Sequence, residues 1–443
     1  MTDPTEDREP SATHPLSWWP APLATAAATA GMLALLAAIV LHRAELVIVA
    51  CGPLALLATA PRHRAASTIS VQVATQTVRL VEFDELVLTV RVSADRPLDH
   101  LAVRLVAGLP LTTAVESSGD VAIDSNHLHC QWRLRPARWG RWPIGTVEIA
   151  AYACGRLVHA TVRVDAGAVA VYPHMVALPG LPRPTRLRAL VGEHVAAAVG
   201  PGVEFAGARP YHNGDEARRV HARLSARRGQ LFVTERHAER LADVVVVVDG
   251  FSDIGAPVRS TLDIAVRACA SVAAAYLRVG DRAGAMLLGS GGVPRSVPLG
   301  LGRLQLARVV ELLIRARDGI SAVEPNLAPL PPQVLPPGAL VLVASPLADQ
   351  RVIDVLAGLR DRGATTILLD VLDPGILPAP SRRMDAVARR LWLLDREALL
   401  SRLADLGVAV LPAADLSTLA ETLATMRVPR PRSGTARVPV GRG

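Results

Sequence analysis

The sequence predicts a multidomain, membrane-anchored chain with an N-terminal transmembrane helical hairpin, an antiparallel β-sandwich-like domain and a doubly wound α/β domain. Three observations predict this architecture. Two uncharged runs lie near the N-terminus, a series of short segments with alternating apolar residues follows, and strands then alternate with helices. A chain of 443 residues also exceeds one ordinary core, so two or three soluble domains are expected.

The expected boundaries follow changes in composition along the chain. We expect an N-terminal tail (1–20), a hairpin (21–64, with spans 21–41 and 45–60), a β domain (65–172), a linker (173–192), an arginine-rich segment (193–240), an α/β domain (241–426) and a disordered basic tail (427–443).

Composition argues against nucleic acid as a partner. Aromatic residues make up only 3% of the chain, which leaves few stacking platforms for bases. The formal net charge is +8, and much of it lies in the arginines of the tail after Met426, so no strong positive field covers the domains. The chain contains no lysine, which rules out a P-loop.

The first uncharged run, 21–41, is long enough to cross a hydrocarbon core at about 1.5 Å per residue. The second, 46–60, is shorter and contains Gly52-Pro53, and Trp18-Trp19 lie where an interfacial aromatic belt is expected. A cleaved signal peptide is the alternative, because 58–60 imitates a cleavage site. The acidic segment ahead of the first run favours the hairpin.

Flanking charge indicates the orientation of the hairpin. Arg62, His63 and Arg64 follow the second run, so the positive-inside rule predicts a multi-pass protein of the plasma (inner) membrane with its soluble domains in the cytoplasm. Cys130 and Cys154 are the only cysteines expected to face each other, and a bridge between them would place the β domain outside. No cysteine spacing typical of a metal site is present.

The β domain is predicted from short runs rich in β-branched residues and separated by turn-rich stretches. Within it, the arginines and tryptophans of residues 133–142 form either a partner-binding edge or a stacked turn. The expected strands are 68–73, 86–92, 101–107, 127–134, 145–152 and 157–164.

The arginine-rich segment is predicted to contain a turn, a helix and a strand. Gly214 suits a positive φ in the turn, and Asp215 is expected to cap a helix over 216–227. Its arginines at 219, 223 and 227 recur every four residues and are expected to line one face of that helix. Gly229 is expected to end it, before a strand over 230–235.

The C-terminal part alternates between buried-strand and helix patterns. In a doubly wound sheet the ligand site lies at the carboxyl ends of the strands, which indicates residues 249–255 and 345–349. The expected strands are 244–248, 282–288, 339–344, 365–371 and 408–411, and the expected helices are 259–279, a helix ending at 360, 396–406 and 416–426.

The arginine-rich segment resembles the family known as domain of unknown function 58. The resemblance rests on Glu204-Phe205, Arg209, Tyr211, Gly214-Asp215, Arg218, Ala226-Arg227, Leu231 and Glu235. It implies a membrane hairpin, a β domain and a von Willebrand factor A-like domain. One residue departs from the pattern, because Ala222 stands where the family usually has tryptophan.

A von Willebrand factor A-like domain implies a metal ion-dependent adhesion site, whose ligands are hard oxygen atoms around Mg²⁺. Asp249 matches the first carboxylate, but Phe251 fills the first hydroxyl position, Pro346 fills the late aspartate position, and 299–304 offers no hydroxyl. We therefore expect a degenerate site with no cofactor. The alternative is a weak, rearranged Mg²⁺ site made by Asp249, Ser252 and Asp253.

The resemblance also implies a partner, a MoxR-type AAA+ ATPase. We expect a membrane-anchored adaptor or scaffold in the maturation or assembly of protein complexes, with an unknown protein client and no catalytic residues. The expected contact residues are Glu204, Arg209, Tyr211, Gly214, Asp215, Arg218, Arg219, Arg223, Arg227 and Glu235.

Two other classes of function are the alternatives. One is a metal-dependent adhesion or ligand-binding module. The other is a hydrolase in which Ser252, His212, His221 and Asp215 act together, although the GxSxG pattern of a nucleophile elbow is absent.

Overall fold

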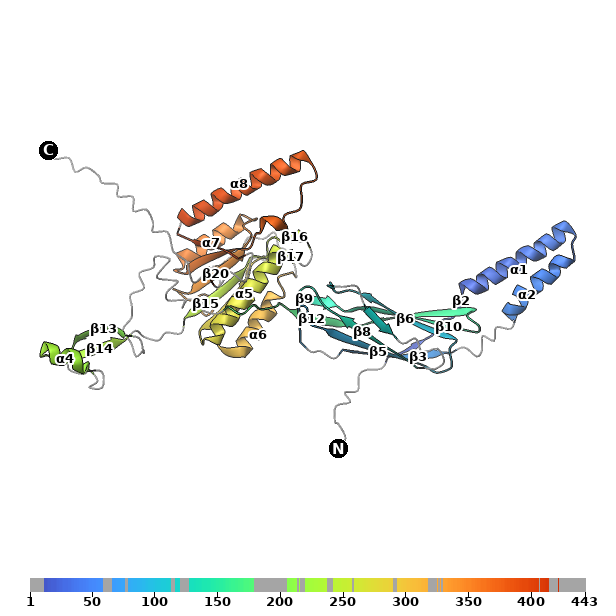
Figure 1. Ribbon diagram of the computed structural model, residues 1–443, viewed down its shortest axis with the longest axis horizontal. Helices are drawn as coiled ribbons and strands as arrows, with labels where there is room; N and C mark the ends of the chain where they lie inside the picture. Colours follow the sequence, from blue (N-terminus) through green and yellow to red (C-terminus); the bar gives the residue numbers. More distant parts are fainter. Residues whose placement is uncertain are drawn as a thin grey trace, which may run out of the picture. The chain divides into compact units, whose positions relative to one another are not determined.

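The chain is described by a computed structural model that divides into two compact units, Met1–His174 and Met175–Gly443 (Figure 1). The described residues are 12–58, 66–75, 79–112, 116–119, 127–178, 205–212, 215, 220–236, 242–256, 259–289, 293–317, 325, 327, 330–405, 407–413 and 421.

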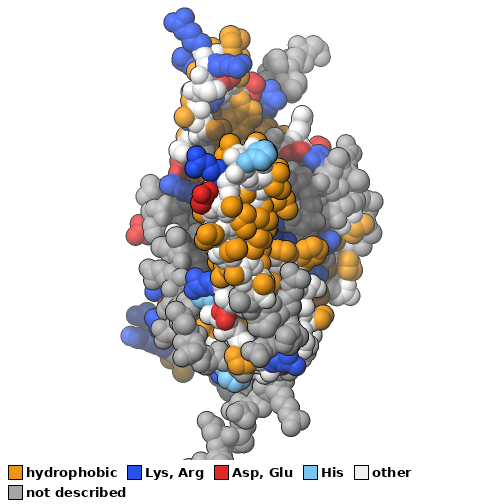
Figure 2. All heavy atoms as spheres, turned by 90° about the vertical axis from the view of Figure 1, so that its right-hand side faces the viewer, with side chains coloured by type: hydrophobic (Ala, Val, Ile, Leu, Met, Phe, Trp, Pro, Cys, Tyr) orange, Lys and Arg blue, Asp and Glu red, His pale blue; other side chains and the backbone are white. Residues whose placement is uncertain are grey.

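The first unit contains a pair of apolar helices, α1 (Pro22–Leu41) and α2 (Glu45–Ala58). Small residues let the two helices approach closely, since a Cβ atom added to Gly31 would lie 2.9 Å from Leu54 Cγ. α1 is long and apolar enough to cross a membrane, whereas α2 is shorter. Figure 2 shows hydrophobic side chains gathered over this hairpin, as expected of a surface that faces lipid.

Two antiparallel sheets enclose one core in the rest of the described part of the first unit. Alternate residues point inward along each strand, so β10 buries Val147, Ile149 and Ala151. One sheet has the order β1 (Ala12–Pro15), β3 (Thr68–Thr75), β5 (Leu86–Ala94), β8 (His127–Leu134) and β7 (Glu116–Gly119), and the other β2 (Trp19–Pro20), β11 (Val158–Asp165), β10 (Gly145–Ala153) and β6 (His100–Ala107). The expected strands are therefore all present.

A third, small sheet joins β4 (Leu80–Val81), β12 (Ala168–Tyr172) and β9 (Gly140–Pro143). Beside it the buried carboxylate of Glu82 accepts the backbone N–H of Trp139 at 3.0 Å and that of His174 at 2.9 Å. Trp139 is fully buried, so this part of the arginine and tryptophan segment belongs to the core. The four cysteines are free thiols, and Cys130 is buried.

The second unit begins, among its described elements, with the antiparallel pair β13 (Phe205–Pro210) and β14 (Phe232–Arg236) and the helix α4 (Ala222–Arg228). The helix predicted over 216–227 begins later than expected. Val220 forms a β-bridge with Val233, and the His221 N–H donates to the Phe232 carbonyl, so neither residue belongs to the helix.

A six-stranded sheet forms the centre of the second unit, in the order β19-β18-β15-β20-β21-β22. All neighbours are parallel except the edge strand β19. The strands are β15 (Asp243–Val248), β18 (Arg282–Leu287), β19 (Arg295–Gly300), β20 (Leu340–Ser345), β21 (Thr365–Asp370) and β22 (Ala409–Pro412). A short β-ladder, β16 (Gly255–Ala256) with β17 (Arg259–Ser260), follows β15.

Helices cover both faces of this sheet (Figure 1). Val245 and Val247 of β15 pack with α7 (Arg351–Asp361) on one face, and α5 (Thr261–Arg278) and α6 (Gly302–Leu313) cover the other. α8 (Arg383–Asp405) begins well before the expected residue 396 and follows the short 3-10 helix η3 (Pro374–Ile376). The helix expected over 416–426 lies almost wholly outside the described residues.

Candidate functional site

An arginine–carboxylate pair fixes the turn between β13 and α4. Arg209 donates from both terminal nitrogens to the two carboxylate oxygens of Asp215, each at 2.7 Å. The same carboxylate accepts the His212 N–H at 2.9 Å. The Arg209 guanidinium therefore holds the pKa of the Asp215 carboxyl well below its usual range. Asp215 thus closes the turn, instead of capping the helix as the sequence suggested.

His221 performs the capping that was assigned to Asp215. Its Nδ1 accepts the Leu224 N–H at 3.2 Å, and the helix ends at Gly229 in the left-handed conformation. On α4, Arg223 and Arg227 lie one turn apart and are exposed. Two of the three predicted arginines therefore share a helical face, while Arg219 lies outside the described residues.

The remaining predicted contact residues are only partly described. Tyr211 is half-buried, and its N–H donates to the Leu231 carbonyl at 2.8 Å. Glu235 lies in β14 opposite Gly207. Glu204, Gly214 and Arg218 lie outside the described residues.

The second predicted locus lies at the carboxyl end of β15. Asp249 is buried, and its carboxylate accepts the Phe251 N–H at 2.9 Å and the Ser345 hydroxyl at 2.6 Å. The sheet places these residues together because β15 and β20 are parallel neighbours. Burial raises the pKa of the Asp249 carboxyl to about 6, although both hydrogen bonds lower it.

Arginines already occupy the surroundings of this aspartate. The Arg351 guanidinium lies 4.1 Å from the centre of the Phe251 ring and donates to both carboxylate oxygens of Asp349. Arg317 pairs with Asp253 at 3.3 Å and with the buried Asp263 at 2.7 Å.

This donor set does not fit a divalent cation. Phe251 supplies no side-chain oxygen, and the guanidinium groups of Arg317 and Arg351 pair with Asp253 and Asp349, the other carboxylates of the loops 249–255 and 345–349. Among the described residues, no group of three or more histidine, cysteine, aspartate or glutamate side chains is placed to hold a metal.

The grouping considered for a hydrolase does not gather around a nucleophile. Ser252 Oγ is buried without a hydrogen-bond partner in the described part of the chain. His221 Nδ1 and the Asp215 carboxylate are already engaged with Leu224 and Arg209. A general base within hydrogen-bond reach of a hydroxyl is the first geometric requirement for such chemistry.

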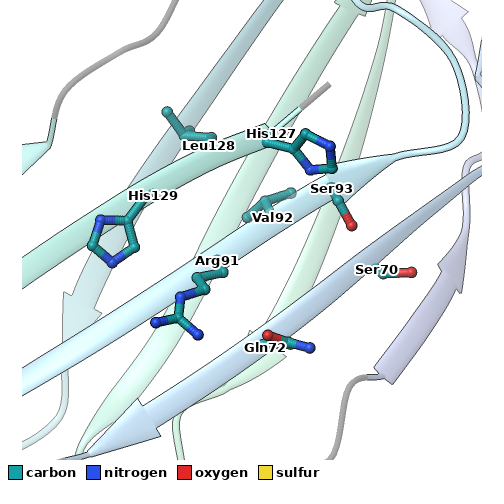
Figure 3. Close-up of a pocket in the computed structure, with 8 residues that line it drawn as sticks. All are labelled: Ser70, Gln72, Arg91, Val92, Ser93, His127, Leu128 and His129. Carbon is teal, nitrogen blue, oxygen red and sulfur yellow. The ribbon is translucent and has the colours of Figure 1, made fainter. Parts of the chain in front are cut away.

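A polar hollow on the first unit was not anticipated from the sequence (Figure 3). Three neighbouring strands, β3, β5 and β8, point side chains toward it at alternate positions, with Arg91 opposite both Gln72 and His129. The lining residues are Ser70, Gln72, Arg91, Val92, Ser93, His127, Leu128 and His129. The period-two recurrence of hydrogen-bonding side chains at 70/72, 91/93 and 127/129 is the signal that could have found it.

Comparison with known families agrees with the signature residues. Residues 207–374 match the family described as protein of unknown function DUF58, a range that includes most of β13, all of β14 and the carboxyl ends of β15 and β20. The resemblance to the DUF58 family is therefore confirmed over this part of the chain. No curated protein matches the chain.

Proposed function

We propose that the protein is a membrane-anchored adaptor or scaffold that works with a MoxR-type AAA+ ATPase in the maturation or assembly of protein complexes. The observation that carries this proposal is the pair of exposed arginines, Arg223 and Arg227, on α4. The helix is short. The ion pair between Arg209 and Asp215 and the β13–β14 ladder hold the chain that leads into its N-terminus. Guanidinium groups held in this way suit an acidic partner surface.

The class of partner comes from the family resemblance. In this proposal the six-stranded sheet is a von Willebrand factor A-like domain, and the locus around Asp249 is a degenerate adhesion site. Asp253 and Asp349 form ion pairs with arginines, and these ion pairs support a binding role without metal and without catalysis.

Membrane attachment supports the same proposal. α1 is one helix that is long and apolar enough to span a bilayer. We place α2 beside it as a second span and both soluble units in the cytoplasm, where an AAA+ ATPase would reach them.

The test is co-purification of the full-length protein from its native membrane. Arg223→Glu with Arg227→Glu should abolish recovery of the ATPase, since four units of charge are changed on one helical face. Arg303→Glu with Arg308→Glu is the matched control, because both arginines are exposed on α6 and the change in charge is the same.

Recovery of the ATPase in the control and its loss in the α4 variant would support the contact surface. Equal recovery with both variants, in chains that melt at the same temperature, would remove α4 from the interface. Absence of any AAA+ ATPase from the parent purification would reject the proposed partner.

A further inference from the structure

The outer side of α8 carries an apolar stripe. The C-terminal part of the helix packs on the sheet through the buried Leu403, with Leu399 and Leu400 partly buried beside it. Among the described residues of α8 before Arg396, none is buried. Four large apolar side chains are instead exposed there: Met384 (73%), Val387 (51%), Leu391 (58%) and Leu394 (53%).

The spacing of the stripe identifies the kind of surface that fits it. Positions i, i+3, i+7 and i+10 are the a and d positions of two heptads. The large exposed apolar side chains of α8 occupy only a and d, the narrow seam of a coiled coil, whereas a helix lying on lipid needs a wider apolar face.

We propose that α8 pairs with α8 of a second copy of this chain as a short, parallel, in-register coiled coil. The charges beside the seam favour this arrangement. Arg390 occupies a g position and Asp395 the following e position, and both are exposed. Parallel pairing therefore brings Arg390 of each copy to Asp395 of the other, twice by symmetry. Antiparallel pairing of the same four apolar residues would bring the two Arg390 side chains together.

Two heptads alone make a weak coiled coil, so the association of two copies needs a further source of free energy. The membrane supplies it, because copies anchored through α1 share one surface and one orientation, which raises their effective concentration. This inference does not depend on the ATPase proposed above.

Cysteine cross-linking in membranes tests the pairing directly. The full-length chain carries Cys51→Ser and Cys154→Ser as a background, since the other two cysteines are buried. In this background Leu391→Cys should form a disulfide-linked dimer on mild oxidation, because an a-position residue meets itself across a parallel seam. Ala386→Cys is the control, being exposed on the same helix away from the stripe.

A charge exchange tests the register. Arg390→Asp should lower the cross-linked fraction of Leu391→Cys several-fold, and adding Asp395→Arg to the same chain should restore it. Cross-linking of Leu391→Cys no greater than that of Ala386→Cys overturns the proposal, as does a charge exchange that restores nothing. If a fluorophore attached at Leu391→Cys reports burial in phosphatidylglycerol vesicles at chain densities that give no cross-link, the stripe binds lipid and the pairing is rejected.

Discussion

At the scale of single residues, the buried Asp249 gives the clearest pH dependence. Its pKa of about 6 lies above the usual 3.8, so the folded chain retains a proton that the unfolded chain releases between these two values. The free energy of unfolding should therefore fall as pH rises through this window, by about 3 kcal/mol in total.

Asp249→Asn removes this titration while leaving an oxygen for the Phe251 N–H and an amide for Ser345. Calorimetry of the solubilised chain should find the variant gaining about 2 kcal/mol relative to the parent between pH 4 and pH 7. A difference between parent and variant that does not change with pH would contradict the raised pKa.

Glu82 leads to a prediction about stability that does not involve pH, because its carboxylate accepts hydrogen bonds from two backbone N–H groups. Glu82→Ala would leave the Trp139 and His174 N–H groups without their carboxylate, at a cost of about 2–5 kcal/mol in the free energy of unfolding. The unfolding transition of the first unit, followed in chemical denaturation, measures this cost. Glu82→Gln retains one acceptor oxygen and should lose less than the alanine variant, and equal losses would show that the acceptor is not what matters.

The position of Asp249 and Phe251 directly after a strand was predictable, because a continuous apolar run precedes them. The sequence did not indicate that Arg317 and Arg351 would lie beside them. Each arginine belongs to a distant segment, and nothing local distinguishes it from other arginines of the chain. The same is true of the pairing of Arg209 with Asp215, where the charges were visible but not their partners.

At the scale of elements, α6 offers a matched pair of leucines. Leu313 is fully buried and Leu304 is 79% exposed on the same helix. Leu313→Ala should lower the free energy of unfolding by about 2–5 kcal/mol through the cavity it leaves. Leu304→Ala should change it by less than about 0.5 kcal/mol. Thermal unfolding of both variants checks the two values, and similar losses would mean that α6 does not pack as described.

Most strands and the beginnings of α1, α2 and α5 were predicted to within a few residues, whereas the beginnings of α4 and α8 were not. The start of α4 was missed because its cap is a histidine, which is not among the usual capping residues. The first half of α8 was missed because its apolar residues face away from the core. A helix with apolar stripes on two sides has no single periodic face for a sequence pattern to reveal.

At the scale of the whole molecule, α1 is a helix long and apolar enough to serve as a membrane anchor. Replacing the adjacent Leu35 and Leu36 with arginine should release the chain from membranes on alkaline extraction, since each central arginine costs about 2.5–3.5 kcal/mol for insertion. Leu304→Arg on the exposed side of α6 is the control and should leave extraction unchanged. Retention of the double arginine variant in the membrane would show that α1 is not the anchor.

The order of the hairpin, the β unit and the α/β unit was predictable, because each has its own period of hydrophobicity. Uncharged runs, alternation and buried runs are properties of local sequence. The pairing of strands distant along the chain, such as β4 with β12, is not such a property.

The position of Glu82 has a mechanical consequence. His174 is the last residue of the first unit, and its N–H is held by this buried carboxylate directly after β12. A pulling force applied to the chain after His174 would first load the hydrogen bond between His174 and Glu82. It would then load the ladders that join β12 to β4 and β9. Ladders on both sides of a strand share a load along its axis, so tension from the second unit would be transmitted to the β unit before β12 could peel away.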